Sequence, residues 1–287
     1  MVPVGDQKAS ELSRTARHDS PGETNVSGIE RPIFDGDAAI TLFTGNYGSG
    51  KTEVSVNVAT SLARAGQTSI TIADLDLVNP YFRCREAREP MERLGIRVVA
   101  PGGDYHNADL PILMPEVRGA IERTQGPTIL DVGGDNVGAT VLAGLAPLLK
   151  TRPHRMAFVL NQSRPFTGTI DGAMQIMDEI ETASRMKVTH IAGNTHMMEE
   201  TDAAMIAAGA EFCNEVARRR GIEVLFVTMA ETLLTRATTP GLLIEVDGID
   251  APVLPLKRIM LPPWLGGPAP GSMATHSRDG FARITHS

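Results

Sequence analysis

The sequence predicts an α/β fold, in which a mostly parallel sheet carries helices on both faces as a three-layer sandwich. Two observations lead to this class. Strand-like and helix-like segments alternate along most of the chain, as parallel strands joined by helical crossovers require. The composition is 42% apolar but only 4% aromatic, so the core must be built from aliphatic side chains, which suits a buried parallel sheet.

The predicted elements follow one another in a regular order. Strands are expected at residues 39–43, 68–73, 96–100, 127–130, 156–160, 188–192 and 223–227. Helices are expected at residues 51–65, 115–123, 137–149, 169–185 and 199–220. Because ligands of such sheets bind at the carboxyl ends of the strands, motifs that follow a strand are the candidates for a functional site.

The two ends of the chain differ in composition from its middle. Residues 1–35 are polar and predict a disordered tail, and residues 265–287, after a stretch rich in Gly and Pro, predict another. Residues 36–264 are expected to form one domain, since single α/β domains are often longer than the usual ~150 residues.

Charge and cysteine content narrow the classes of partner and the compartment. The net charge of -7 disfavours nucleic acid and anionic membranes as partners, and no apolar segment is long enough to span a bilayer. Cys84 and Cys213 form no CxxC pattern, so we expect no metal cluster and a reducing, cytoplasmic location. The three arginines at 218–220 indicate the solvated end of a helix, with a polyanion contact as the alternative.

The strongest functional signal follows the predicted strand at 39–43. It has the pattern G-x-x-x-x-G-K-[ST], and its residues are Gly45, Asn46, Tyr47, Gly48, Ser49, Gly50, Lys51 and Thr52. Average amino-acid usage gives about 0.01 chance matches in a chain of this length. Glycines let the backbone turn its N–H groups around phosphate oxygens, and the helix that follows adds its positive end. Lys51 is expected to reach the β- and γ-phosphates, and Thr52 to bind Mg²⁺.

A first acidic motif ends the predicted strand at 68–73. Asp74 and Asp76 are two residues apart, so both carboxylates are expected on one side of the sheet. We expect Asp76, in preference to Asp74, to orient the attacking water or a water bound to magnesium. The alternative is a structural role in which the carboxylate caps a loop or a helix.

A second acidic motif follows the predicted strand at 127–130. Asp131 stands where a carboxylate holds Mg²⁺, often through water, so Asp131, Thr52 and Asp76 are the predicted metal ligands. The run from Asp131 to Gly134 also has the pattern D-x-x-G, in which the Gly134 N–H is expected to sense a γ-phosphate. Asp135 has two equal interpretations, support of the metal site or a helix N-cap.

Two further strand ends carry asparagine. We expect Asn194 to contact the nucleotide base, because an amide can bond to a purine edge through both of its ends. Asn161 is more typical of an Asx-turn, with a base contact as its alternative. No N-K-x-D guanine signature is present, which favours ATP over GTP. The polar cluster of His106, Asn107 and Asp109 is expected to be solvated, with a contact to a substrate or partner as the alternative.

The order of these motifs resembles the CobQ/CobB/MinD/ParA class of nucleotide-binding domains, in the SIMIBI branch of the P-loop NTPases. The P-loop, the Asp74 to Asp76 motif and the Asp131 to Asp135 motif carry the resemblance. Residues 43–264 are similar to a subgroup described only as ATP-binding proteins, which the run 74–83 and the Leu-Pro-Pro-Trp at 261–264 also fit. The resemblance implies a SIMIBI-like sandwich and a Mg²⁺-dependent ATPase switch that often dimerises around nucleotide.

One position departs from the pattern. MinD and ParA proteins have a signature Lys directly after the first Gly of the loop, and here that position is Asn46. In those proteins the Lys reaches across the dimer to the partner's nucleotide, so a nucleotide-dependent homodimer is left open for this chain. The nucleotide site is carried over from the resemblance, and the cell-biological role is not.

Three classes of function remain after the sequence is considered. The one we expect is a Mg-dependent ATPase, with Lys51 and Asp76 as catalytic residues, that acts as a switch on an unidentified protein partner. The second is an ATP-dependent phosphoryl-transfer or ligase-type enzyme, for which only Arg83, Arg85 and the 104–109 loop offer additional polar groups. The third is a nucleotide-binding regulatory module without significant turnover.

Overall fold

The computed structural model describes residues 24–28, 30–34, 39–76, 87–100, 110–123, 125–134 and 136–259. Their main feature is an eight-stranded sheet with the order β10-β8-β7-β6-β2-β5-β3-β4, in which every neighbouring pair is parallel. The strands are β2 (Ile40–Thr44), β3 (Thr71–Leu75), β4 (Arg97–Val99), β5 (Thr128–Val132), β6 (His154–Leu160), β7 (His190–Gly193), β8 (Glu223–Ala230) and β10 (Val253–Leu256). The predicted α/β class is confirmed.

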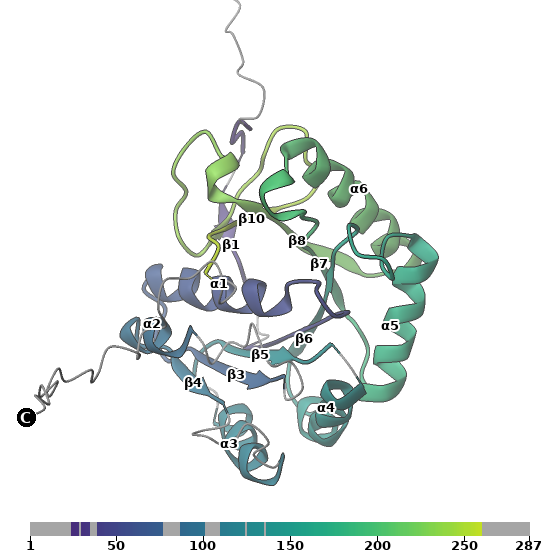
Figure 1. Ribbon diagram of the computed structural model, residues 1–287. Helices are drawn as coiled ribbons and strands as arrows, with labels where there is room; N and C mark the ends of the chain where they lie inside the picture. Colours follow the sequence, from purple (N-terminus) through teal and green to yellow (C-terminus); the bar gives the residue numbers. More distant parts are fainter. Residues whose placement is uncertain are drawn as a thin grey trace, which may run out of the picture.

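Helices cover both faces of this sheet (Figure 1). One face packs against α1 (Lys51–Arg64) and α2 (Arg88–Arg93), and the other against α3 (Leu110–Glu122), α4 (Asn136–Leu149), α5 (Ile170–Ser184) and α6 (Ala203–Arg220). The central strand β2 is buried throughout, with Leu42 in the core beneath α3 to α6 and Phe43 in the core beneath α1. No helix in the described ranges has the length and apolarity that a membrane span needs.

Two predicted elements are shifted along the chain. β3 begins at Thr71 rather than at residue 68, because Ser69 has a left-handed backbone (φ 59°) that a strand does not tolerate. The shift places Asp74 inside the strand. α6 begins at Ala203 rather than at residue 199, because the Asp202 carboxylate caps it by accepting the Met205 N–H at 2.8 Å. Residues 198–200 form a separate 3-10 turn.

Three further differences involve proline or short elements. α3 begins at Leu110 and contains Pro115, which the sequence predicted as its first residue. β10 was not predicted. It contains Pro255, which is uncommon in strands, but β10 lies at the edge of the sheet, where one unpaired backbone position is tolerated. The short helix α2 was also not predicted.

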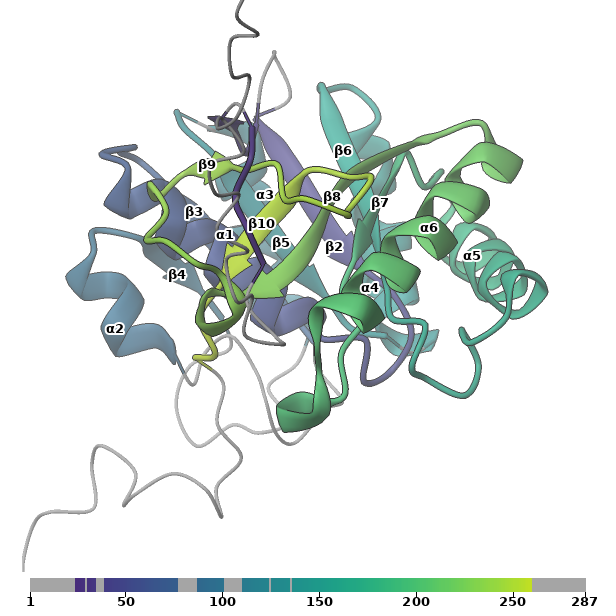
Figure 2. The same ribbon diagram turned by 90° about the horizontal axis from the view of Figure 1, so that it is seen from above.

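The prediction of a disordered N-terminal tail over residues 1–35 does not hold for residues 24–28 and 30–34, which fold against the domain. β1 (Arg31–Pro32) pairs with β9 (Leu242–Leu243) in an antiparallel manner, and Figure 2 shows the two side by side. Ile33 is only 1% exposed and packs into the core beneath α1. Composition could not reveal this, because one apolar side chain and a few backbone bonds are enough to dock a polar segment. Residues 1–23 and the predicted C-terminal tail, 265–287, lie outside the described residues.

Candidate functional site

The P-loop joins the end of β2 to the start of α1, at the carboxyl edge of the sheet. Gly50 caps α1 with a φ of 87°, and a Cβ there would lie 2.2 Å from Nδ2 of Asn194. A Cβ at Gly45 would lie 2.5 Å from the carbonyl oxygen of Val159. Glycine is therefore required at both positions for the loop to pass between its neighbours and present the helix N-terminus to an anion.

Lys51 is held against the loop instead of extending into solvent. Lys51 is only 7% exposed, and its Nζ donates to the carbonyl oxygen of Asn46 at 3.3 Å. The D-x-x-G segment approaches from the other side, so closely that a Cβ at Gly134 would lie 2.7 Å from both Nζ of Lys51 and the carbonyl oxygen of Gly45. The structure thus brings together two predicted nucleotide contacts, Lys51 and Gly134, from separate motifs.

Three buried carboxylates gather on the β3–β5 side of the loop. Asp74 and Asp131 are register partners on neighbouring strands and are 0% exposed, and Asp76 is 5% exposed. The Asp76 backbone N–H donates to Oδ1 of Asp74 at 3.0 Å. The hydroxyl of Ser55, from α1, lies 3.5 Å from Oδ1 of Asp131. Carboxylates that the sequence placed in two separate motifs therefore form one acidic cluster next to the P-loop helix.

The electrostatics of Asp131 indicate what this cluster lacks. Burial raises the pKa of Asp131 to about 8, the Asp74 carboxylate adds to the increase, and Lys51 and a hydrogen bond with Thr52 oppose it. Oδ2 of Asp131 is buried and has no hydrogen-bond partner within the described part of the chain. A divalent cation supplies both the missing charge and the missing partner, so these residues fit Mg²⁺.

The protein alone does not complete a metal site. In the described ranges, no group of three or more His, Cys, Asp or Glu side chains is placed to hold an ion. A cation next to Asp131 would therefore also need the Thr52 hydroxyl, water and the oxygens of a bound phosphate, which is how P-loop proteins bind Mg²⁺.

The β6–β7 side of the loop carries a different set of polar groups. Nδ2 of Asn194 donates to the carbonyl oxygen of Ser49 at 2.7 Å, and Oδ1 of Asn194 accepts from the Thr228 hydroxyl at 2.6 Å. Nε of Arg164 donates to the carbonyl oxygen of Gly48 at 2.8 Å. Both ends of the Asn194 amide thus have partners inside the protein, and its contact with a base stays a prediction.

His196 lies on the same side, close to Gly50. A Cβ at Gly50 would be 3.7 Å from Nε2 of His196. Burial, together with the positive charges of Arg164 and Arg258, lowers the pKa of His196 to about 4. Arg258 in turn pairs with Glu199 at 2.8 Å. The P-loop therefore has an acidic side and a basic side, which face it from opposite directions.

Other sequence predictions have mixed outcomes. Asn161 forms the expected turn, since its Oδ1 accepts from the Ser163 N–H at 2.9 Å. The arginines at 218–220 end α6 and pair with Glu215 and Asp178. Several features lie outside the described residues: Leu77 to Arg83, Cys84, Arg85, His106, Asn107, Asp109, Asp135 and Leu261 to Trp264.

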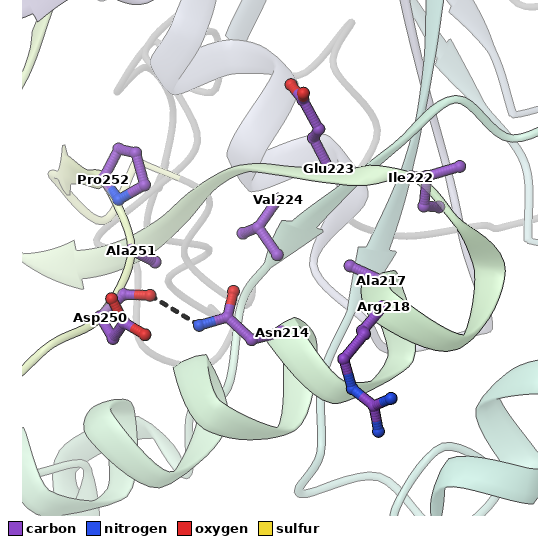
Figure 3. A pocket seen from close by; sticks show the side chains of 9 residues that line it. All are labelled: Asn214, Ala217, Arg218, Ile222, Glu223, Val224, Asp250, Ala251 and Pro252. Atoms are coloured by element: carbon purple, nitrogen blue, oxygen red, sulfur yellow. Dashed lines mark hydrogen bonds between the residues drawn. The ribbon is translucent and has the colours of Figure 1, made fainter.

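A cavity of about 460 Å³ lies at the amino ends of the strands, away from the P-loop and next to the first residues of β8 (Figure 3). Asn214 of α6 lines it and donates to the carbonyl oxygen of Asp250 at 2.6 Å. Arg218, which also lines it, pairs with Glu215. Ligands of parallel sheets bind at the carboxyl ends of the strands, so the P-loop, and not this cavity, is the candidate site.

Three functional neighbours of the loop were missed by sequence reasoning. Arg164 follows β6, His196 follows β7 and Thr228 lies in the second half of β8. The available signal was their position near strand ends close to β2. That signal was too general, because it does not say which side chains turn toward the loop.

Similarity to known proteins is found among solved structures. No protein-family model and no curated protein matches this chain. Among solved structures, the chain is similar to cell division protein FtsY from Thermotoga maritima, with 18% identity and a TM-score of 0.46 over 78% of this chain and 68% of that one. It is also similar to the 54 kDa signal recognition particle protein from Aeropyrum pernix in complex with GDP, with 19% identity and a TM-score of 0.46 over 74% of this chain and 45% of that one.

A third solved structure is a nucleotide-binding protein from Archaeoglobus fulgidus in complex with ADP, with 16% identity and a TM-score of 0.38 over 64% of this chain and 80% of that one. This chain spans less than half of the signal recognition particle protein. The similarities concern the arrangement of strands and helices, and the functional argument rests on the residues of this chain.

Proposed function

We propose that this protein binds Mg-ATP at the P-loop, hydrolyses it slowly, and uses the nucleotide state as a switch on a protein partner in the cytoplasm. One observation carries the proposal: Lys51 lies between the P-loop and Gly134, beside an acidic cluster in which one buried oxygen of Asp131 has no partner among the described residues. A polyphosphate and its cation are the ligand that meets both needs.

Each residue has a defined task in this proposal. Lys51 contacts the β- and γ-phosphates, and Thr52 and Asp131 hold Mg²⁺. The buried carboxylate of Asp76 orients the attacking water, or a water on the metal. The Gly134 N–H contacts the γ-phosphate. ATP is favoured over GTP because the sequence lacks the N-K-x-D signature.

Exposed apolar side chains support a protein partner at this edge of the molecule. Within the described residues, the exposed large hydrophobic side chains include Tyr47 (73%) on the P-loop and Phe166 (70%), Met197 and Met198 on the two loops that bond to it. Apolar side chains exposed around a functional site are typical of protein contacts. The partner is an unidentified protein, or a second copy of this chain in a nucleotide-dependent homodimer.

Calorimetry with Mg-ATP tests the site. The purified protein is expected to bind, and Lys51→Ala to bind about 100-fold more weakly, because a buried charge-assisted contact to phosphate is lost. The matched control is Lys150→Ala, an exposed lysine after α4, which should bind as the parent does. Absence of binding by the parent protein would refute the proposal, and equal binding by Lys51→Ala would refute the role of the loop.

The switch is tested by measuring hydrolysis and molecular mass. Turnover by the protein alone should be slow, and sedimentation with and without a non-hydrolysable ATP analogue should separate a homodimer from a monomer. A mass that is unchanged at saturating nucleotide would reject the homodimer. Fast turnover in the absence of any partner would instead favour an enzyme acting on a small molecule.

A further inference from the structure

A loop that turns its N–H groups toward a phosphate must direct carbonyl groups the other way, and those groups need donors of their own. Two successive carbonyl groups of this P-loop, those of Gly48 and Ser49, have such donors. Both donors are side chains from outside the loop, Nε of Arg164 at 2.8 Å and Nδ2 of Asn194 at 2.7 Å. The loop is therefore attached on its outer side to the segments that follow β6 and β7.

We propose that Arg164 and Asn194 are positioning residues that hold the P-loop in its phosphate-binding shape, and that Thr228 fixes the direction of the Asn194 amide. The inference rests on the proposed function, because phosphate is the ligand for which the loop is held. Neither side chain has to touch the nucleotide, since each acts through a backbone carbonyl group of the loop.

The Asn194 attachment is buried and directional. Asn194 is 4% exposed and Thr228 is 6% exposed, so water does not replace their bonds easily. The Thr228 hydroxyl donates to Oδ1 of Asn194 at 2.6 Å, which leaves Nδ2 to face the carbonyl oxygen of Ser49. A flipped amide would place two acceptors against each other. Gly50 allows this close approach, because a Cβ there would lie 2.2 Å from Nδ2.

The Arg164 attachment lies at the surface. Its bond to the carbonyl oxygen of Gly48 is solvent-exposed, and a Cβ at Gly48 would lie 3.5 Å from Nε of Arg164. Removal of this side chain leaves no cavity in the core, so the protein is expected to fold without it. Arg164 therefore gives the cleaner test of the two attachments.

The first experiment compares Arg164→Ala with Arg152→Ala. Arg152 is a matched control, because it also donates from the surface to a backbone carbonyl group, that of Glu122 at 2.8 Å, but before the start of β6. We expect Arg164→Ala to accelerate amide hydrogen exchange in residues 45–52 of the nucleotide-free protein, and to weaken ADP binding, each by about tenfold, the size of one charge-assisted hydrogen bond. Arg152→Ala should change neither quantity.

The outcomes separate this inference from the proposed function. Unchanged exchange at 45–52 in Arg164→Ala overturns the inference, even if ADP binding weakens, because the arginine then acts by its charge alone. Faster exchange in a protein whose parent binds no ADP supports the attachment and refutes the nucleotide function. Faster exchange together with weaker ADP binding supports both.

The second experiment compares Thr228→Val with Thr228→Ser. Valine has nearly the shape of threonine but no hydroxyl, so the Asn194 amide loses the bond that fixes its direction. We expect Thr228→Val to weaken ADP binding by about fivefold, as the loss of one buried hydrogen bond predicts, and to accelerate exchange at 45–52. Thr228→Ser keeps the donor and should resemble the parent. Equal behaviour of the two variants would overturn the role of Thr228.

Discussion

The two sides of the P-loop differ in the polar group that lies closest to the loop, the Asp131 carboxylate on one side and the Asn194 amide on the other. On the β3–β5 side, three carboxylates lie buried together, and Oδ2 of Asp131 has no partner within the described residues. On the β6–β7 side, the Asn194 amide has a partner at each end. Oδ2 of Asp131 therefore stays unsatisfied until a ligand arrives, whereas the Asn194 amide is satisfied without one. Under the proposed function, ligand binding and loop positioning therefore belong to different strands.

The largest expected effect comes from Asp131→Asn, which removes an ionisable group from the acidic side of the loop. ATP hydrolysis should fall by about 100-fold, since a metal ligand is lost. For the same reason, the factor by which Mg²⁺ strengthens ATP binding should fall by about 100-fold. The nucleotide-free protein should nevertheless become more stable by about 1–2 kcal/mol, or roughly 2–8 °C in Tm, because folding no longer has to bury and protonate a carboxyl group whose pKa burial raises to about 8. An ATPase assay and thermal unfolding measure the two effects.

The control for this variant is Asp171→Asn, whose side chain is 98% exposed and which should change neither quantity. A loss of stability in Asp131→Asn would contradict the comparison, because it would mean that the carboxylate is already satisfied in the nucleotide-free protein.

A smaller effect is expected from Gly134→Ala, which tests how closely the acidic side approaches the loop. The new Cβ would lie 2.7 Å from the backbone oxygen of Gly45, so one of the two segments must move. We expect ATP binding to weaken by about 1–3 kcal/mol, as for other overpacked sites. Calorimetry measures it. Gly119→Ala in α3 is the control, because its Cβ would meet only the flexible end of Arg123. Equal ATP affinity in both variants would show that the P-loop and the Gly134 segment can move apart without weakening ATP binding.

The last effect concerns the pH dependence of stability on the basic side. The pKa of His196 is lowered to about 4 in the folded protein, and the unfolded value is about 6.5. Above pH 6.5 the residue is neutral in both states. As the pH falls from 6.5 to 4, the unfolded state takes up the proton first, so stability is lost, by up to about 3 kcal/mol.

His196→Gln should remove this contribution. In urea unfolding at pH 7 and pH 4.5, the variant should lose less free energy of unfolding than the parent between the two values, with pH 7 as the internal control. An equal loss in both proteins would show that His196 titrates normally and that the basic side of the loop does not shield it from water.

Sequence reasoning predicted the parts of the site whose chemistry requires fixed residue types at fixed spacing. The P-loop and the aspartates that follow β3 and β5 belong to this class. The first residue of β3 was missed because a single residue with a left-handed backbone, Ser69, prevents the strand from beginning earlier. The loop attachments were missed for another reason. Arg164 and Gly48 are 116 residues apart, and no local pattern marks such a pair.

The pairing of β1 with β9 has a practical consequence for anyone who shortens this chain for expression. A start at residue 36, where the composition changes, would remove Ile33 from the core, at a cost of about 1.5–3 kcal/mol for one buried aliphatic side chain. It would also leave the backbone of β9 without its partner strand, a template for aggregation. Affinity tags and cleavage sites therefore belong upstream of Thr24.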